Sequence, residues 1–147
     1  MNSNIVHIYT DGACAGNPGP GGYGVVLLYN GAEKRISGNA RHTTNNRMEL
    51  TAAIAGLAAL KRPCTVALYS DSRYVVDAVR QGWVHSWRTN GWRRKGGKPV
   101  LNPDLWERLM PLLHTHKVSF VWVKAHADCE YNNLCDEMAN AAIRTMV

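Results

Sequence analysis

The apolar residues have the spacing of strands up to about residue 44 and mainly that of helices after it, and this division limits the folds that the chain can adopt. Before it the pattern is that of strands, and an Asn30-Gly31 pair favours a hairpin between the second and third of them. After it, helical spacing is interrupted by short apolar strands. Strands are predicted over residues 5–10, 23–29, 34–39, 64–69 and 117–123, and helices over 45–62, 74–79, 83–88, 102–113 and from about 132.

This order, β-β-β-α-β-α-α-α-β-α, predicts an α/β fold in which a mixed five-stranded sheet is flanked by helices. Tight turns make the first three strands antiparallel, whereas helical crossovers make the first, fourth and fifth parallel. Thr44 or Asn45 is predicted to cap the first helix and Ser72 the second. The predicted apolar faces are Leu50, Ala53, Ile54, Leu57 and Ala58 in the first helix and Leu134, Met138, Ala141 and Ala142 in the last.

The composition is that of a folded globular protein. A length of 147 residues fits one domain, 1–147, and 46% hydrophobic with 19% charged residues argues against disorder. The N-terminus shows no leader pattern and no apolar run reaches about 18 residues, so we expect a soluble cytoplasmic protein, without a membrane partner, that acts as a monomer. The glycine-rich residues 12–22 lack the Gly-Lys-Ser/Thr ending of a phosphate-binding loop and are interpreted as a turn.

Cysteine usage points to free thiols. The four cysteines form no CxxC pair, and in a chain without a leader they are expected to be reduced. His126, Cys129 and Cys135 could in principle hold zinc, but their spacing matches no standard zinc site.

Four acidic residues occupy places where a strand ends or a helix begins: Asp11, Glu49, Asp71 and Asp136. Singly, each would be a turn, a cap or a solvated helix position. Together they are more informative, because Asp11 and Asp71 follow strands predicted to be parallel, and ligands collect at the carboxyl ends of such strands. Crowded carboxylates repel one another unless a cation neutralises them, and oxygen ligands suit Mg²⁺ or Mn²⁺. The pattern therefore favours hydrolysis of a phosphodiester by two ions about 3.5–4 Å apart.

A basic, tryptophan-rich segment, about residues 81–99, suggests the kind of substrate. The formal net charge is +6, and residues 80–98 contain six basic and no acidic side chains. Trp83, Trp87 and Trp92 are interleaved with them and could be core residues, nucleic-acid contacts or both. Cations without neighbouring anions favour a polyanionic partner. The basic residues are Arg80, Arg88, Arg93, Arg94, Lys95 and Lys98.

The motifs TDGACAGNPGPGGYG, TTNNRMEL, SDSRYV, KPV-N-DLW, VKAH and CDEMA occur together in an order and spacing that resemble bacterial type 1 ribonuclease H from about Ile5 to Ile143. The resemblance implies a ribonuclease H-like sheet and a metal-dependent endonuclease that cleaves the RNA strand of RNA–DNA hybrids, leaving 5′-phosphate and 3′-hydroxyl ends. It implies two Mg²⁺ ions per site, with Mn²⁺ as a substitute, held by Asp11, Glu49, Asp71 and Asp136. His126, on the loop after the last strand, would assist proton transfer or product departure.

The same resemblance implies contacts with the hybrid. Thr44 would meet a DNA phosphate, and the segment around residues 83–98 would form a basic protrusion that grips the DNA strand. Ala125, Glu130 and Leu134 depart from the family pattern near the His126 loop. The remaining candidate substrate contacts are Cys14, Asn17, Asn45, Asn46, Arg73, Trp83, Trp87, Arg88, Trp92, Arg93, Arg94 and Lys95.

Two alternatives stay open at this point. The chain could be a hybrid- or double-stranded-RNA-binding module that has lost catalysis, although it keeps all four acids. It could also be a DNA-specific nuclease of the same fold, although TTNNRMEL and the basic segment argue against that.

Overall fold

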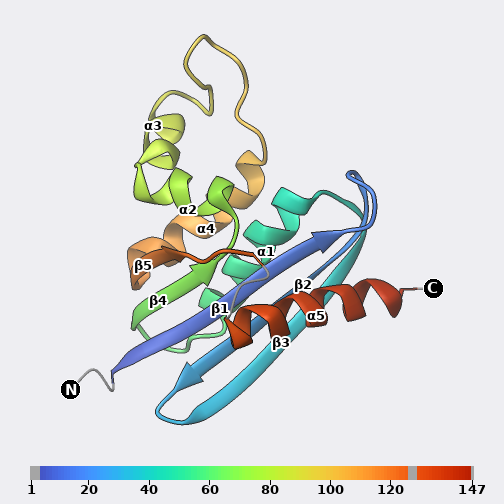
Figure 1. Cartoon of the computed structure of the whole chain (residues 1–147). Helices are drawn as coiled ribbons and strands as arrows, with labels where there is room; N and C mark the ends of the chain where they lie inside the picture. Colours follow the sequence, from blue (N-terminus) through green and yellow to red (C-terminus); the bar gives the residue numbers. More distant parts are fainter. Residues whose placement is uncertain (1–3, 126–128, 147) are drawn as a thin grey trace.

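A single five-stranded sheet organises the molecule, and its strand order is β3-β2-β1-β4-β5 (Figure 1). The computed structural model describes residues 4–125 and 129–146. β1 pairs antiparallel with β2, and β2 with β3, whereas β1–β4 and β4–β5 are parallel. The predicted topology is therefore confirmed. The strands are β1 (Ile5–Cys14), β2 (Gly19–Tyr29), β3 (Ala32–Thr43), β4 (Thr65–Ser70) and β5 (Lys117–Trp122).

Helices cover both faces of this sheet. α5 (Glu130–Arg144) crosses β1, β2 and β3 on one face (Figure 1). On the other face α1 (Asn45–Ala58) packs on β1 and β2 and is backed by α4 (Pro103–Thr115). α2 (Arg73–Arg80) leads into α3 (Trp83–Thr89), and the loop after α3 projects from the rest of the molecule (Figure 1). None of the helices in the described residues is long and apolar enough to cross a bilayer.

The core lies between the sheet and α1. Alternate residues of β1, among them Ile8, point into it, and the α1 face meets them through Leu50 and Leu57, which are fully buried. Burying one such side chain stabilises the fold by about 1.5–3 kcal/mol. Ala58 was predicted on this face but is exposed, because it lies in the last turn of α1, where the helix ends.

The turn in the glycine-rich segment is shorter than the predicted range of residues 12–22. β1 continues to Cys14 and β2 begins at Gly19, with Gly12 opposite Tyr23. Glycine is needed in these strands because helices approach them closely. A Cβ on Gly12 would lie 2.5 Å from the Glu49 backbone nitrogen, so residue 12 must be small for α1 to place Glu49 beside β1.

The last helix begins at Glu130, before the predicted start, and its buried face is rotated from the predicted one. Of the predicted residues Ala142 is buried, whereas Leu134, Met138 and Ala141 are half-buried, and Cys135 and Ala139 are the other buried apolar residues. The reason is the same close approach: a Cβ on Gly24 would lie 2.5 Å from the Cys135 carbonyl oxygen. Small side chains therefore face the sheet, and the larger ones lie beside the contact.

Candidate active site

Three carboxylates converge at the carboxyl edge of β1 and β4. Asp11 is in β1, Asp71 follows β4, and Glu49 is in the second turn of α1; one oxygen from each lies within 4.8 Å of the others. The parallel register pairs Tyr9 with Tyr69, so Asp11 and Asp71 each follow two residues later on neighbouring strands. The predicted side-by-side placement of these two acids is confirmed.

Local hydrogen bonds fix the segments that carry these acids. The Thr44 hydroxyl oxygen accepts the Arg47 backbone N–H at 3.2 Å and so caps α1, which contains Glu49. Similarly, the Ser72 hydroxyl oxygen accepts the Val75 N–H at 3.2 Å at the start of α2. Ser72 was the predicted cap of the second helix, and Thr44 was one of the two candidates for the first. The two caps fix Glu49 in the first turns of α1 and Asp71 directly before α2.

Burial and mutual repulsion raise the pKa of Asp11 to about 8. Burial has the largest effect, followed by the negative charges of Asp71 and Asp136. One backbone contact opposes them, because the Gly12 N–H donates to Asp11 Oδ1 at 2.9 Å and favours the charged form. Without a cation, the charged form of Asp11 is therefore disfavoured near neutral pH.

Glu49 is in an even less favourable position for a charge. It is 4% exposed, and its Oε1 atom has no hydrogen-bond partner among the described residues. Burial, and then the charges of Asp11 and Asp71, hold its pKa well above the usual value. A buried carboxylate oxygen without a partner is costly unless a cation meets it. The donor set is entirely oxygen, so these residues fit Mg²⁺ or Mn²⁺.

The fourth predicted acid, Asp136, borders the same hollow, which has a volume of about 500 Å³. It comes from the second turn of α5 and lies outside the set of three oxygens within 4.8 Å. Contacts with the sheet hold this helix in place: the Tyr131 and Tyr9 rings lie 5.1 Å apart, and the Cys135 thiol donates to the Tyr9 carbonyl at 3.2 Å. Burial raises the pKa of Cys135 to about 12.

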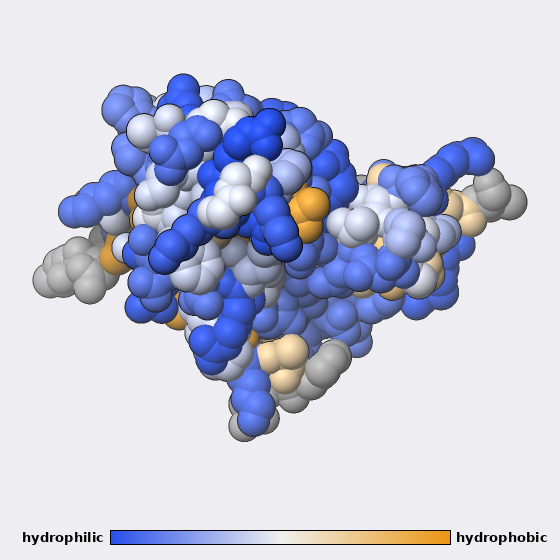
Figure 2. Space-filling model, turned by 90° about the horizontal axis from the view of Figure 1, so that it is seen from above, coloured by the Kyte–Doolittle hydropathy of each residue, from blue (hydrophilic) through white to orange (hydrophobic). Residues whose placement is uncertain are grey.

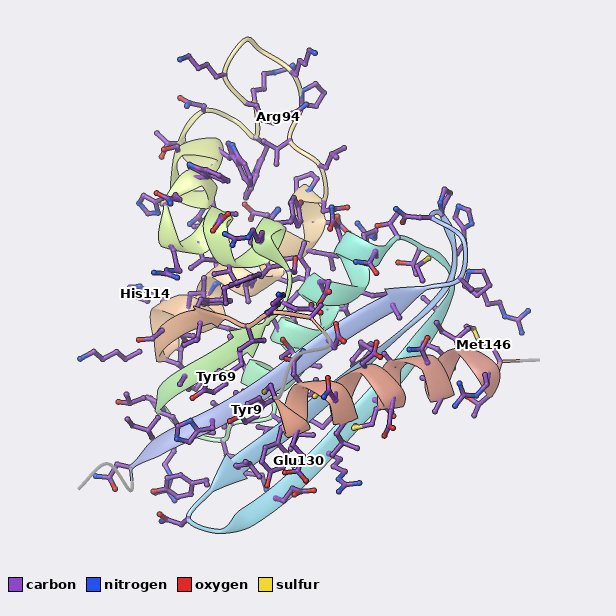
Figure 3. The ribbon with its side chains drawn as sticks, in the orientation of Figure 1. Tyr9, Tyr69, Arg94, His114, Glu130 and Met146 are labelled. Atoms are coloured by element: carbon purple, nitrogen blue, oxygen red, sulfur yellow. The ribbon has the colours of Figure 1, made fainter. Side chains whose placement is uncertain are left out.

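Tyr9 also stacks on Tyr69, with ring centroids 4.4 Å apart, and both lie on the sheet face that carries α5 (Figure 3). Cys14, Cys64, Cys129 and Cys135 are all free thiols, as predicted. His126 lies outside the described residues. The expected role of His126 therefore remains a prediction.

Several predicted substrate contacts border the acidic hollow. Cys14, Asn45, Asn46 and Arg73 line it. Asn17 lies next to them, because its side-chain oxygen accepts the Asn45 backbone N–H at 3.0 Å. The Cys14 thiol points to backbone carbonyls, those of Gly19 and Thr43, at 3.5 Å each.

The basic protrusion forms a second, separate surface. Trp83, Trp87, Arg94, Lys95 and Lys98 line a shallow hollow of about 410 Å³. Arg94 lies on the loop that projects beyond α3 (Figure 3). The face of the molecule seen from above is mostly hydrophilic (Figure 2). No acid lines this hollow in the described part of the chain, which suits a polyanion.

The tryptophans of this segment differ in burial. Trp87 packs edge-on against the fully buried Trp106 at 6.0 Å, whereas Trp83 is 47% exposed. Trp92 is half-buried against the core, and its backbone N–H donates to the Trp87 carbonyl at 2.7 Å. Both interpretations of these residues therefore apply, since Trp87 and Trp92 support the protrusion while Trp83 is open to solvent.

The basic side chains themselves are exposed. The Arg88 Nε atom lies 3.8 Å from Glu107 Oε1, and because both side chains are exposed this ion pair is weak. Arg93 donates to the Gly97 carbonyl at 2.9 Å and so braces the loop, while Arg94 and Lys95 are exposed.

Sequence analysis missed three side chains at the site. Asn140 donates to the Asp136 carboxylate at 3.3 Å, and its spacing of four residues along α5 could have indicated that contact. Tyr74 lines the hollow. Trp122 donates its indole N–H to the Asp71 carbonyl at 3.1 Å, a contact that no local pattern signals because it joins two strands.

Comparison with known proteins agrees with this geometry. A family model described as RNase H matches residues 3–144. Curated proteins named ribonuclease H include one from Thermoanaerobacter sp. (strain X514), 56% identical over 97% of this chain and 92% of its own length. Another, from Desulforamulus reducens, is 57% identical over 98% of this chain and 92% of its own length.

Solved structures lead to the same family. The crystal structure of LC9-RNase H1, a type 1 RNase H with the type 2 active-site motif, superposes with a TM-score of 0.84 at 32% identity over 98% of this chain and 74% of that one. LC11-RNase H1, solved in complex with an RNA/DNA hybrid, gives a TM-score of 0.70 at 29% identity over 95% and 96%. The chain therefore belongs to the type 1 ribonuclease H family of metal-dependent endoribonucleases.

Proposed function

We propose that this protein cleaves the RNA strand of RNA–DNA hybrids endonucleolytically by a two-metal-ion mechanism, leaving 5′-phosphate and 3′-hydroxyl ends. The observation that carries the proposal is the convergence of Asp11, Glu49 and Asp71, with an unpartnered buried oxygen on Glu49, in one hollow. The catalytic domain would span residues 1–147. The LC11-RNase H1 complex supports the hybrid as substrate, since that relative was solved with an RNA/DNA hybrid.

The acids would hold Mg²⁺, with Mn²⁺ as a substitute. Asp11, Glu49 and Asp71 would supply the inner oxygen ligands, and Asp136 would complete the site from α5. When bound, two such ions supply an activated water and stabilise the charge on the leaving oxygen. The chain's own residues align the strand to be cut, and the geometry of the caps at Thr44 and Ser72 keeps the ligands preorganised.

The remaining candidate residues would bind and orient the substrate. Cys14, Asn17, Asn45 and Asn46 surround the acids and would meet the minor groove, where the 2′-hydroxyl distinguishes RNA from DNA. Thr44 would contact a DNA phosphate. The protrusion, with Trp83, Trp87, Arg88, Trp92, Arg93, Arg94 and Lys95, would grip the DNA strand outside the acidic hollow.

A substrate panel tests the proposal. Labelled RNA–DNA hybrid, single-stranded RNA, double-stranded RNA and DNA duplex are each incubated with Mg²⁺ or with EDTA. We expect cleavage of the hybrid alone, and only with Mg²⁺, with 5′-phosphate on the products. Hybrid binding without cleavage would favour the binding-module alternative, and cleavage of DNA duplex would favour a DNA-specific nuclease.

Neutralising the protrusion should weaken binding. The triple replacement of Arg93, Arg94 and Lys95 by glutamine is expected to lower hybrid affinity and to flatten the plot of log affinity against log salt by roughly one unit for each lost phosphate contact. A matched control replaces by glutamine three exposed basic residues at the opposite end of the sheet, Lys34, Lys61 and Arg62. If the two triple variants lose the same amount of hybrid affinity, then net charge alone accounts for the effect and the protrusion makes no specific contact with the hybrid.

Replacing His126 by alanine should slow turnover without eliminating it. A histidine can accept and release a proton near neutral pH. If His126 transfers a proton in the reaction, its loss should remove one of the changes in cleavage rate with pH between about pH 6 and 9. Steady-state rates measured across that range check this. An unchanged profile would rule out the proton-transfer role.

A further inference from the structure

One basic side chain lies among the described carboxylates of the acidic hollow without pairing with any of them. Arg73 is the single basic residue among the described residues that line the acidic hollow. It is exposed, and in the part of the chain that the structure describes it forms no ion pair. Arg73 follows Asp71 by two residues and lines the same hollow, yet the two side chains do not form an ion pair. A different contact therefore determines where the Arg73 head group lies.

That contact is the face of Trp122. The Arg73 guanidinium carbon lies 4.0 Å from the centre of the Trp122 ring, a cation–π arrangement. When the flat face of a guanidinium is held in this way, its N–H groups remain free to donate in the plane of the group. The free edge therefore remains available to an acceptor that enters the hollow.

Trp122 also forms a hydrogen bond with the backbone of Asp71. Its indole N–H donates to the Asp71 carbonyl at 3.1 Å. β5 places the ring there, because Trp122 is in register with Ser70 of β4, and the Val123 N–H donates to the Ser70 carbonyl at 3.0 Å. The Trp122 side chain thus contacts both Asp71, a candidate metal ligand, and the guanidinium of Arg73.

We propose that Trp122 is a positioning residue that presents Arg73 to a phosphate of the cleaved strand next to the bond being broken, while its N–H fixes the Asp71 backbone. The edge of a planar guanidinium matches the oxygens of a phosphate. The positive charge of Arg73 would also reduce the repulsion between the carboxylates of the hollow and a phosphate of the bound strand. This assignment rests on the proposed function. It adds to it the ligand of Arg73 and the residue that holds Arg73 in place.

The test compares kcat and KM on an RNA–DNA hybrid with Mg²⁺ for variants of both residues. Arg73→Gln should raise KM about tenfold, leave kcat within about twofold, and lower the salt slope of binding by about one unit. Arg62→Gln, an equal charge change at an exposed position at the opposite end of the sheet, should leave KM within about twofold. Trp122→Phe keeps a ring face but loses the N–H, so it should keep KM and lower kcat several-fold.

The double variant separates positioning from a general structural role. Trp122→Leu should raise KM as much as Arg73→Gln does, and Arg73→Gln made in that background should then add less than about twofold. If Trp122→Leu does not fold, as thermal unfolding would reveal, Trp122→Phe and the Arg73 variants still decide the matter. Multiplicative effects, or an unchanged KM and salt slope in Arg73→Gln, would overturn the proposal.

Hybrids of permuted base sequence distinguish a phosphate from a base. A KM effect of Arg73→Gln that is the same for all sequences supports a phosphate contact, whereas an effect that depends on one base position and leaves the salt slope unchanged contradicts it. Failure of the proposed function is a separate result, because the wild-type protein would then not prefer the hybrid in the first place.

Discussion

Glu49→Gln is expected to lower the rate of hybrid cleavage by roughly a thousandfold or more while the protein stays folded. The substitution keeps the shape of the side chain but removes the negative charge from a position that is 4% exposed and has an unpartnered oxygen. A neutral amide is a poor ligand for Mg²⁺ in comparison with a carboxylate. Asp71→Asn should have a similar effect. Single-turnover rates at saturating hybrid measure the loss directly.

Glu137→Gln is the matched control, because it makes the same chemical change at an exposed position next to Asp136 on α5. It should leave the cleavage rate within about twofold. Circular dichroism and thermal unfolding of both variants distinguish a lost ligand from a lost fold. Near-normal turnover by Glu49→Gln would contradict the assignment of Glu49 as a metal ligand.

The element order and the acidic cluster could be predicted because both depend on local patterns. Apolar alternation gives the strands, caps such as Thr44 and Ser72 mark helix starts, and the parallel placement of β1 and β4 then brings Asp11 and Asp71 together. Each step uses residues close in sequence or a general rule of chain topology.

The features that could not be predicted depend on contacts between distant segments. Which face of α5 is buried follows from the closeness of that helix to Gly24, and no periodicity within α5 contains that information. The strand pairing of the glycine-rich segment was missed for the same reason, since turn residues in isolation resemble a loop. Likewise, Trp122 joins the site through the register of β5 on β4.

Asp11→Asn should stabilise the metal-free protein at neutral and alkaline pH. The pKa of Asp11 is raised from 3.8 to about 8 by folding, so this carboxyl contributes stability fully below about pH 4 and that contribution is lost as pH rises through about 8. An amide at position 11 does not ionise, so the free energy of unfolding of the variant does not include this loss. We expect the variant to exceed the wild type by about 5 kcal/mol at pH 8, since each pKa unit between 3.8 and about 8 corresponds to about 1.4 kcal/mol, and by almost nothing near pH 4.

Chemical denaturation in EDTA across this range measures the difference. Comparing the two proteins at each pH cancels the titration of groups distant from Asp11, while the pKa of Glu49, which the Asp11 charge helps to raise, falls in the variant and adds to its stability. Mg²⁺ should then reverse the order, because on the proposed assignment it would bind the folded wild type through Asp11, a ligand that the variant lacks. A constant difference at all pH values would contradict the ionisation of Asp11 as its cause.

Asp104→Asn is the control of opposite sign. A hydrogen bond from Arg47 lowers the pKa of Asp104, so this exposed carboxylate contributes stability above its ordinary pKa and loses it as the pH falls. Its replacement should therefore destabilise the protein slightly at neutral pH, by less than about 1 kcal/mol, and not at all in acid. Mg²⁺ should not alter that difference, since Asp104 pairs with Arg47 and does not line the acidic hollow. The two aspartates would thus give stability differences of opposite sign, because folding raises one pKa by burial among like charges and lowers the other by contact with a cation.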